Sequence, residues 1–245
     1  MMIVIHHLGI SQSERIVWLC EELGVPYQLV KHIRDPIASP ESLTSLPGNK
    51  TGKSPYIEDT DTGVSLSESC AICDYIIYRH AGGKLALQPD DIHYPDYLYW
   101  YHYANGTQQP AMMTSMFLSH VPTDAPIKQA VEQRLHAMLK HTNDRLATSK
   151  WLAGPEFTAA DVMSVYGLTT QRYWGPQVSL KPYPHILRWL ADCASREAYK
   201  RAMEKGDPEM ECLVGAEPPN VNMFEVGGTK SDHWKKKLNE GQATL

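Results

Sequence analysis

The sequence predicts an α/β domain followed by an all-α domain, within a chain of 245 residues. Up to about residue 81, short β-branched runs alternate with segments of helical periodicity, which is the pattern of a small sheet with crossover helices. After Pro89 and Pro95, the periodic segments are helical only. We therefore expect a first domain at residues 1–81, a linker at 82–95, a helical domain at 96–207 and a tail at 208–245.

The first domain opens with a predicted strand at residues 3–7 and a helix that begins at Glu14. An apolar stripe at helical spacing runs from Ile16 to Leu23, and Gly24 suits the position just after a helix. The remaining expected elements are a strand at 27–33, a loop or broken helix at 36–49, two strands at 55–59 and 64–66 joined by a turn at 61–63, and a helix at 69–79.

The second domain is expected to be helical throughout. Amphipathic segments lie at residues 131–146, 158–170 and 184–204. Thr158 and Asp161 have the spacing of a capping box, and Phe157 is placed to be its hydrophobic staple.

The last stretch, from about Pro208, is rich in Gly, Pro and charge, with Lys235-Lys236-Lys237 near its end. This composition is typical of a flexible tail. Packing of the tail against the body is the alternative.

Composition excludes several functional classes. The formal net charge of −5 gives no reason to expect a nucleic-acid partner. No apolar run approaches the roughly 20 residues that span a bilayer, and the N-terminus lacks the leader of a signal peptide. The five cysteines are an odd, dispersed set, which favours a reducing compartment. We expect a cytoplasmic protein that binds neither membrane nor nucleic acid.

Four segments carry a resemblance to a known family. They are Asn49-Lys50-Thr51-Gly52-Lys53-Ser54-Pro55, Glu68-Ser69-Cys70-Ala71-Ile72, Phe157-Thr158-Ala159-Ala160-Asp161 and Tyr183-Pro184-His185-Ile186-Leu187-Arg188-Trp189. In this order and at these distances, over residues 3–205, they resemble the cytosolic glutathione S-transferases. The resemblance implies a thioredoxin-like N-terminal domain joined to an all-α C-terminal domain, which is the GST fold.

The resemblance also implies where glutathione, the cosubstrate, binds. The backbone of Ser54 is expected to pair with the cysteine of glutathione, and Pro55 to follow a cis peptide bond. Glu68 and Ser69 resemble the pair that holds the γ-glutamyl end, a carboxylate for the ammonium and a helix N-terminus for the carboxylate. The alternatives are an ordinary trans proline and a serine that only caps a helix.

The third anchor of glutathione, for its glycine carboxylate, is left open. The family often carries a basic residue about nine positions before Asn49, where this chain has Ser39-Pro40-Glu41. The candidates in its place are Lys53, His32, Arg34 and Lys50.

The turn after the first strand resembles that of the serine-type transferases, which are theta- or phi-like. Ser11 is the first candidate for the catalytic hydroxyl and Ser13 the second, with Gln12 as a polar helper at the glutathione site. A free thiol titrates near 8.5, so a hydroxyl donor and a helix N-terminus are needed to favour the thiolate at neutral pH. The alternative is that both serines are helix caps. The turn has no cysteine, which weighs against the cysteine-type relatives.

Two other patterns are weaker. Cys70 and Cys73 form a C-x-x-C inside a predicted helix rather than in the turn, and we interpret them as two small buried residues. The histidines lack ligand spacing, so no metal is expected.

The pocket for the second substrate is expected on the early helices of the second domain. An aromatic and methionine-rich surface there suits apolar electrophiles. The candidate lining residues are Tyr97, Tyr101, Asn105 and Met112, with Tyr173 closing the pocket from a later helix, together with Tyr166 and Trp174. Plain helix packing and a dimer seam are the alternative.

The leading hypothesis is a homodimeric glutathione transferase that adds the thiolate to an apolar electrophile, as in detoxification. A second hypothesis is a glutathione-dependent isomerase or peroxidase, as in secondary metabolism. The third is a protein of the same fold that binds ligands or partners without catalysis. Turnover of an aromatic halide separates the first from the third, and a product of unchanged mass indicates the isomerase.

Overall fold

The structure is a computed structural model and describes residues 2–231. Its N-terminal part contains one four-stranded sheet with the order β2-β1-β3-β4. The strands are β1 (Ile3–Leu8), β2 (Tyr27–His32), β3 (Tyr56–Asp59) and β4 (Val64–Ser67). β1 pairs in parallel with β2, whereas β1–β3 and β3–β4 are antiparallel. This mixed sheet and the helices that accompany it form the predicted thioredoxin-like domain.

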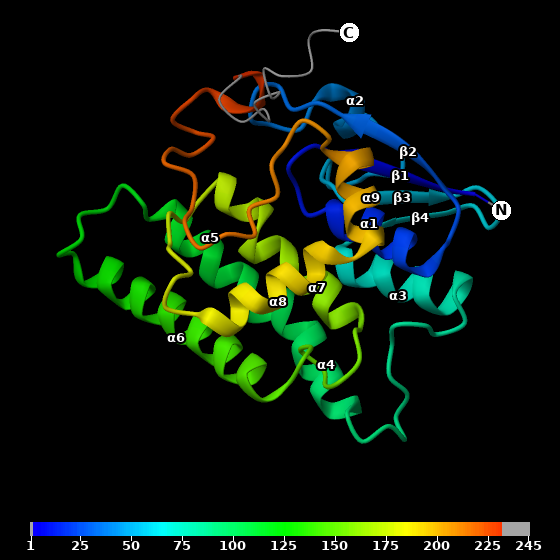
Figure 1. Ribbon diagram of the computed structural model, residues 1–245. Helices are drawn as coiled ribbons and strands as arrows, with labels where there is room; N and C mark the ends of the chain where they lie inside the picture. The colour runs from blue at the N-terminus through cyan, green and yellow to red at the C-terminus, as the bar shows by residue number, and fades with distance from the viewer. Residues whose placement is uncertain (1, 232–245) are drawn as a thin grey trace, which may run out of the picture.

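Three helices accompany the sheet: α1 (Glu14–Leu23), α2 (Glu41–Thr44) and α3 (Ser69–His80). Figure 1 shows α2 on the opposite side of the sheet from α3. The predicted helix after β1 is confirmed, and it ends at Gly24, whose φ of 67° is the left-handed conformation that glycine adopts without strain. The predicted loop or broken helix at residues 36–49 contains only the four-residue α2.

Between residues 94 and 206, the chain is mainly helical, as predicted. The α-helices of this region are α4 (Tyr94–Tyr103), α5 (Gln109–Phe117), α6 (Pro126–Thr148), α7 (Ala159–Leu168), α8 (Pro184–Ser195) and α9 (Glu197–Gly206). A π-helical segment, η1 (Ala104–Gln108), joins α4 to α5, and two 3₁₀ turns are η2 (Thr170–Tyr173) and η3 (Gly228–Lys230). The predicted capping box of Thr158 and Asp161 is present at the start of α7.

One hydrophobic core joins the two parts. The buried cluster includes Trp18 of α1, Ile57 of β3 and Trp189 of α8. α9 packs against α1, so the last long helix lies against the first one. Within the described residues, no helix is long and apolar enough to cross a membrane.

The segment after α9 packs on the body as far as the structure describes it. The backbone N–H of Met223 donates to Tyr173 at 2.9 Å, and that of Thr229 donates to Pro36 at 3.2 Å. Met210 and Met223 are buried in a second hydrophobic cluster. For residues 208–231, the packed alternative is therefore the one observed; Lys235-Lys236-Lys237 lie outside the described residues.

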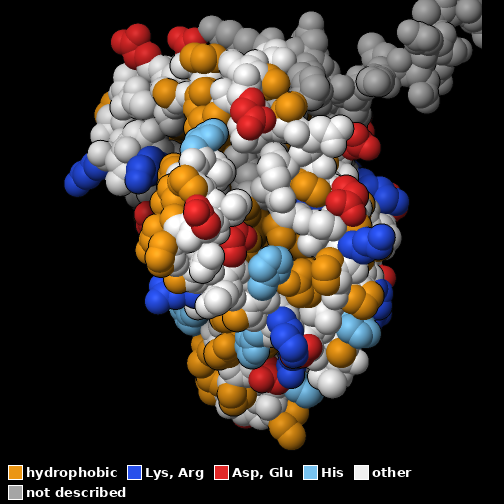
Figure 2. Space-filling model, turned by 90° about the vertical axis from the view of Figure 1, so that its left-hand side faces the viewer, with side chains coloured by type: hydrophobic (Ala, Val, Ile, Leu, Met, Phe, Trp, Pro, Cys, Tyr) orange, Lys and Arg blue, Asp and Glu red, His pale blue; other side chains and the backbone are white. Residues whose placement is uncertain are grey.

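The face of the molecule in Figure 2 carries acidic and basic side chains side by side, interleaved with hydrophobic ones. Neither sign of charge dominates that face, in keeping with a formal net charge of −5.

Candidate active site

A cleft of about 270 Å³ lies where the end of β1, the start of β3 and the helical part of the chain meet. Four residues of the predicted glutathione site line it: Ser11, Gln12, Lys53 and Ser54. Three further candidates, Arg34, Tyr166 and Trp174, line it as well. The other lining residues are Leu8, Ile37, Ser39, Met113, Met116, Gln171 and Phe224. One wall of the cleft is thus polar, and the facing wall is largely aromatic and sulfur-containing.

The peptide bond between Ser54 and Pro55 is cis. The Ser54 hydroxyl donates to the carbonyl of His6 at 3.0 Å and accepts from the N–H of Leu8 at 3.3 Å. These bonds hold the start of β3 against the end of β1. Within residues 2–231, the backbone N–H and C=O of Ser54 have no hydrogen-bond partner, so both are available to an extended peptide.

Ser11 and Ser13 lie together just before α1. Their hydroxyl oxygens are 2.8 Å apart, and Ser13 is also 2.8 Å from Nδ1 of His7. Ser13 is fully buried, whereas Ser11 is 5% exposed and lines the cleft. Of the two candidate serines, Ser11 is therefore the one that a molecule in the cleft can contact.

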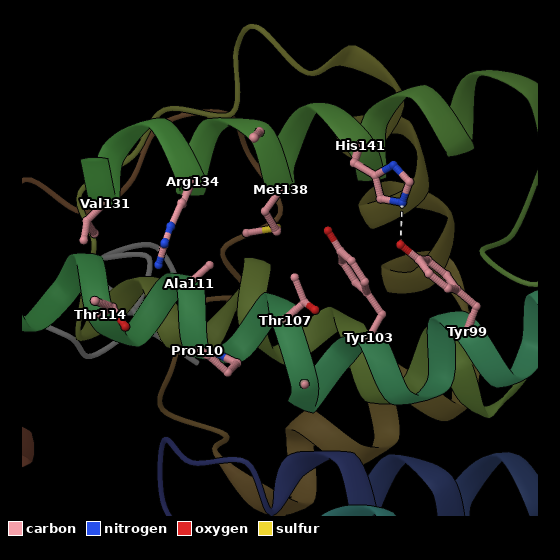
Figure 3. A pocket seen from close by; sticks show the side chains of 12 residues that line it. Tyr99, Tyr103, Thr107, Pro110, Ala111, Thr114, Val131, Arg134, Met138 and His141 are labelled. Atoms are coloured by element: carbon pink, nitrogen blue, oxygen red, sulfur yellow. Dashed lines mark hydrogen bonds between the residues drawn. The ribbon is translucent and has the colours of Figure 1, made fainter. Parts of the chain in front are cut away.

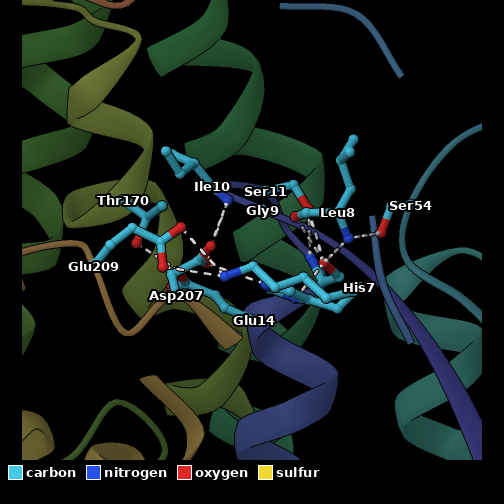
Figure 4. A network of polar contacts seen from close by, with 12 residues as sticks. His7, Leu8, Gly9, Ile10, Ser11, Glu14, Ser54, Thr170, Asp207 and Glu209 are labelled. Atoms are coloured by element: carbon cyan, nitrogen blue, oxygen red, sulfur yellow. Dashed lines mark hydrogen bonds and ion pairs between the residues drawn. The ribbon is translucent and has the colours of Figure 1, made fainter. Parts of the chain in front are cut away.

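Behind the serines lies a buried histidine–carboxylate pair that the sequence did not reveal. Nε2 of His7 is 3.1 Å from Oδ2 of Asp207, and both side chains are almost completely buried. The backbone N–H of Ile10 also donates to this carboxylate. Figure 4 shows the pair beside Ser11 and Ser54. His7 and Asp207 are 200 positions apart, so no local signal connects them.

Glu68 and Ser69 stand at the N-terminus of α3. Glu68 is exposed and adopts φ 75° and ψ 120°, a left-handed conformation that is uncommon for any residue except glycine. Ser69 is the first residue of the helix and is buried. The structure therefore places this predicted pair at the start of a 12-residue helix, where backbone N–H groups point outward.

The basic residues that could bind the glycine carboxylate of glutathione differ in the contacts that they make. The guanidinium of Arg34 donates to three backbone carbonyls, those of Gly9, Ile10 and Ile37, and stacks over Trp174 at 4.7 Å. His32 is buried and bonded to His6 and Ser42. Lys50 is exposed in the loop before β3. Lys53 is exposed and lines the cleft, so its ammonium is accessible to a ligand there.

The predicted second-substrate residues lie elsewhere. Tyr97, Tyr101 and Met112 belong to the hydrophobic core, where the Tyr101 hydroxyl donates to Asp74 at 2.9 Å. Tyr173 is buried in the second cluster and donates to the carbonyl of Glu211. The apolar wall of the cleft instead comes from Met113, Met116, Tyr166, Trp174 and Phe224. Met113 and Met116 come from the predicted methionine-rich stretch. Tyr166 and Trp174 come from the later helical region that was expected to close the pocket.

Asn105 contacts a buried arginine. Its side-chain oxygen accepts from Arg15 at 3.0 Å, and Arg15 also donates to Gln12 at 2.6 Å. The guanidinium lies 5.2 Å from the centre of the Tyr166 ring. Asn105 sits in the π-helical segment, a local widening that often occurs at functional sites. Through Arg15, this segment positions two residues of the cleft, Gln12 and Tyr166.

Neither Cys70 nor Cys73 lines the cleft. Cys73 is buried, and Cys70 is half-buried and accepts from the Asn105 amide at 3.6 Å. Burial raises the pKa of both thiols, which keeps them protonated. Within the described chain, no group of three or more His, Cys, Asp or Glu side chains is placed to hold a metal ion.

A second hollow, of about 500 Å³, lies between α4, α5 and α6 (Figure 3). Tyr99 and His141 are bonded across it at 3.0 Å, and Arg134 and Met138 line it from α6. It is larger than the cleft at Ser54, but none of the predicted glutathione residues lines it. We therefore assign the candidate active site to the smaller cleft.

Comparisons with known proteins agree with this fold. Residues 6–84 match the model of the glutathione S-transferase N-terminal domain, and residues 108–197 match that of the C-terminal domain. Glutathione S-transferase 3 of Schizosaccharomyces pombe is 31% identical over 219 residues, covering 83% of this chain and 88% of the relative. Glutathione S-transferase 1 of Saccharomyces cerevisiae is 25% identical and covers 83% of this chain and 95% of the relative.

Among solved structures, a glutathione S-transferase from Actinobacillus pleuropneumoniae superposes with a TM-score of 0.74 at 26% identity, covering 84% of this chain and 93% of that one. The chain therefore belongs to the family of glutathione S-transferase enzymes.

Proposed function

We propose that the chain is a glutathione S-transferase that binds glutathione in the cleft and uses the Ser11 hydroxyl to stabilise its thiolate for attack on an apolar electrophile. The observation that carries the proposal is that Ser11 and the free backbone groups of Ser54 face one cleft beside a cis proline. The cleft brings together a peptide-binding edge and a hydroxyl donor.

Each part of glutathione has a proposed partner. Its cysteine backbone pairs with Ser54 as an added strand. Its α-ammonium meets the carboxylate of Glu68, and its α-carboxylate meets the N-terminus of α3 at Ser69, where the helix dipole favours an anion. Its glycine carboxylate meets Lys53, the exposed base that lines the cleft.

The hydroxyl of Ser11 stabilises the thiolate by donating a hydrogen bond. The first N–H groups of α1 are bonded to the carbonyls of Ser11, Gln12 and Ser13, so the helix adds only the field of its dipole. A decrease of about two in the thiol pKa, from about 8.5, corresponds to roughly 2.7 kcal/mol in favour of the anion. The electrophile then lies against Met113, Met116 and Trp174. The thiolate sulfur attacks its electron-poor carbon and forms a C–S bond, while the carbon–halogen bond of an aromatic halide breaks and the halide ion leaves to solvent.

We further propose a homodimer in which the first part of one subunit faces the helical part of the other. Tyr78 on α3 and Tyr99 on α4 are 57% and 50% exposed, which is high for large aromatic side chains. Light scattering should give twice the mass of the chain, and Tyr99→Asp should shift the protein towards monomer. A monomeric wild type would contradict this part of the proposal.

Calorimetric titration with glutathione tests the binding site. The wild type should bind in the micromolar to millimolar range, and Glu68→Ala should weaken binding at least tenfold, because the ammonium loses its charged partner. Ser195→Ala, an exposed change at the end of α8, is the control and should bind as the wild type does. A wild type that does not bind glutathione would contradict the proposal.

Product analysis tests the reaction. With an aromatic halide, the product should have the mass of a glutathione conjugate. Ser11→Ala should lower kcat/KM by about ten- to a hundredfold, since one hydrogen bond to a charged atom is lost. With a substrate that carries a conjugated double bond, a product of unchanged mass and altered geometry would indicate isomerisation instead.

A further inference from the structure

Four polar side chains form a continuous series from the cleft into the interior, and Figure 4 labels three of them, Ser11, His7 and Asp207. Ser11 Oγ lies 2.8 Å from Ser13 Oγ, and Ser13 Oγ lies 2.8 Å from Nδ1 of His7. On the far side of the imidazole, Nε2 lies 3.1 Å from the carboxylate of Asp207. The series therefore connects the cleft hydroxyl to a buried carboxylate.

The donors and acceptors of Ser13 can be counted. A hydroxyl has one hydrogen and two lone pairs. One lone pair of Ser13 is used, because the backbone N–H of Leu8 donates to it at 3.2 Å. One hydrogen and one lone pair remain for its two nearest neighbours, Nδ1 of His7 and Oγ of Ser11, whereas the carbonyl of Leu8 is more distant at 3.3 Å. Ser13 must therefore donate to one of these neighbours and accept from the other.

The direction depends on the proton at Nδ1 of His7. Without that proton, Ser13 donates to His7 and accepts the hydroxyl hydrogen of Ser11, which then points away from the cleft. When Nδ1 carries the proton, His7 donates to Ser13, and Ser13 donates to Ser11. The backbone N–H of Ser13 also donates to Ser11 Oγ, at 3.3 Å. Both lone pairs of Ser11 are then occupied, and its own hydrogen points into the cleft.

The carboxylate of Asp207 faces Nε2 of His7 and the hydroxyl of Ser13 faces Nδ1, so each ring nitrogen has a partner that can accept a hydrogen bond. Asp207 is 2% exposed, and a buried carboxylate is costly without a positive partner. Burial raises the pKa of Asp207, but its interactions with His7, the charge of Lys31 and the backbone N–H of Ile10 together hold the pKa below its usual value. Asp207 is therefore ionised at neutral pH.

The other charged groups nearby do not replace His7 as the contact partner of Asp207. Burial raises the pKa of Glu14 to about 8, so this neighbouring acid is mostly uncharged at neutral pH. The remaining groups are Lys31, which pairs with Glu209, Arg34, which binds backbone carbonyls, and His32, whose pKa is lowered by burial.

We propose that His7 and Asp207 are positioning residues: as an imidazolium–carboxylate pair, they set the direction of this series so that Ser11 donates to the glutathione thiolate. No proton moves along the series, and the proton of the thiol leaves to solvent. The inference rests on the proposed role of Ser11, which it deepens. Loss of the Nδ1 proton would reverse the series and remove the donor from the cleft.

Two amides at position 7 test the proposal. In His7→Asn, the amide nitrogen takes the place of Nδ1 and donates to Ser13 at every pH. In His7→Gln, it takes the place of Nε2 and does not reach Ser13. The pKa of bound glutathione, measured from the ultraviolet absorbance of the thiolate, should stay low in His7→Asn and rise by about one to two pH units in His7→Gln. Asp207→Asn should behave as His7→Gln does.

Asp59→Asn is the matched control, because Asp59 and His80 form another buried carboxylate–histidine pair, at 2.9 Å. It should lower the melting temperature without changing the thiol pKa. Equal thiol pKa values in His7→Asn and His7→Gln would overturn the proposal, even if Asp207→Asn fails to fold. If Ser11→Ala raises the thiol pKa and His7→Gln does not, the positioning role alone fails. If Ser11→Ala leaves it unchanged, the proposed function fails.

Discussion

Ser54 performs two tasks with two parts of one residue. Its hydroxyl holds β3 to β1, through Leu8 and His6, while its backbone N–H and C=O have no hydrogen-bond partner among residues 2–231. The structural task and the proposed binding task can therefore be separated by changing the side chain alone.

Ser54→Ala should lower the free energy of unfolding by about 1 kcal/mol, since a bond to the His6 carbonyl is lost while Leu8 keeps Ser13 as a partner. The dissociation constant for glutathione should change less than about threefold, which is under 1 kcal/mol. Urea denaturation and calorimetry measure the two quantities. A large loss of affinity at unchanged stability would mean that the hydroxyl itself binds glutathione.

Glu14 gives a prediction about pH. Burial, with a smaller contribution from the charge of Asp207, raises its pKa from 4.5 to about 8, although a hydrogen bond from Thr170 opposes this. The folded state therefore binds the proton more tightly than the unfolded chain does. The stability that this provides is complete below pH 4.5 and is lost as the pH rises towards 8, by up to about 1.4 kcal/mol per pH unit.

Glu14→Gln has no such titration. Its stability relative to the wild type should therefore improve steadily from pH 5 to pH 8, as measured by urea denaturation at each pH. A difference between the two proteins that does not vary with pH would show that Glu14 ionises normally in the folded state.

Residue types within one short motif were predictable, whereas a partner from a distant segment was not. Ser11 and Ser54 belong to local patterns with a chemical purpose, and the structure brings both to one cleft. Asp207 follows the last long helix and meets His7 only because α9 packs against α1. Only the tertiary structure could show that contact.

At the scale of elements, the π-helical segment η1 explains where the expected pocket residues lie. In a continuous α-helix through residues 94–117, side chains would keep one regular spacing around the axis from end to end. The π-helical segment η1 shifts this spacing, so the faces of α4 and α5 are rotated relative to each other. Asn105 therefore meets Arg15, while Met113 and Met116 reach the cleft. The sequence could not show which aromatic and methionine side chains of residues 94–117 line the cleft and which belong to the core.

The capping box of α7 was predictable because its signal is local, and it gives a graded prediction. Thr158→Ala removes one cap and should cost about 1 kcal/mol of unfolding free energy. Asp161→Ala should cost about 3 kcal/mol, because Asp161 also accepts from the N–H of Leu152 and the indole of Trp189. Asp192→Ala, on the surface of α8, should cost under about 1 kcal/mol. Equal costs at Thr158 and Asp161, measured by denaturation, would contradict this ranking.

At the scale of the whole molecule, the segment after α9 links both parts of the chain. It bonds to Tyr173 in the helical part and to Pro36 beyond β2, and it brings Phe224 to the cleft, 5.4 Å from the Trp174 ring. Composition alone favoured a flexible tail, because the few apolar residues that anchor it are widely spaced. The domain boundaries near residues 81 and 95 stay predictions, since one hydrophobic core crosses them.

Two neighbours in this segment should behave differently. Met223 is fully buried, so Met223→Ala should cost about 2–5 kcal/mol of unfolding free energy. Phe224 is 45% exposed at the cleft, so Phe224→Ala should cost under about 1 kcal/mol but raise KM for an apolar electrophile. Denaturation and steady-state kinetics check the pair. An unchanged KM in Phe224→Ala would place the electrophile elsewhere.

If Ser11 stabilises the thiolate of bound glutathione, the thiol pKa of the complex depends on its hydroxyl. That pKa can be measured for glutathione bound to the wild type and to Ser11→Ala, from thiolate absorbance against pH. It should lie about two pH units below 8.5 in the wild type and rise by about one to two in the variant, with little change in affinity. The same low pKa in both proteins would contradict this role of Ser11.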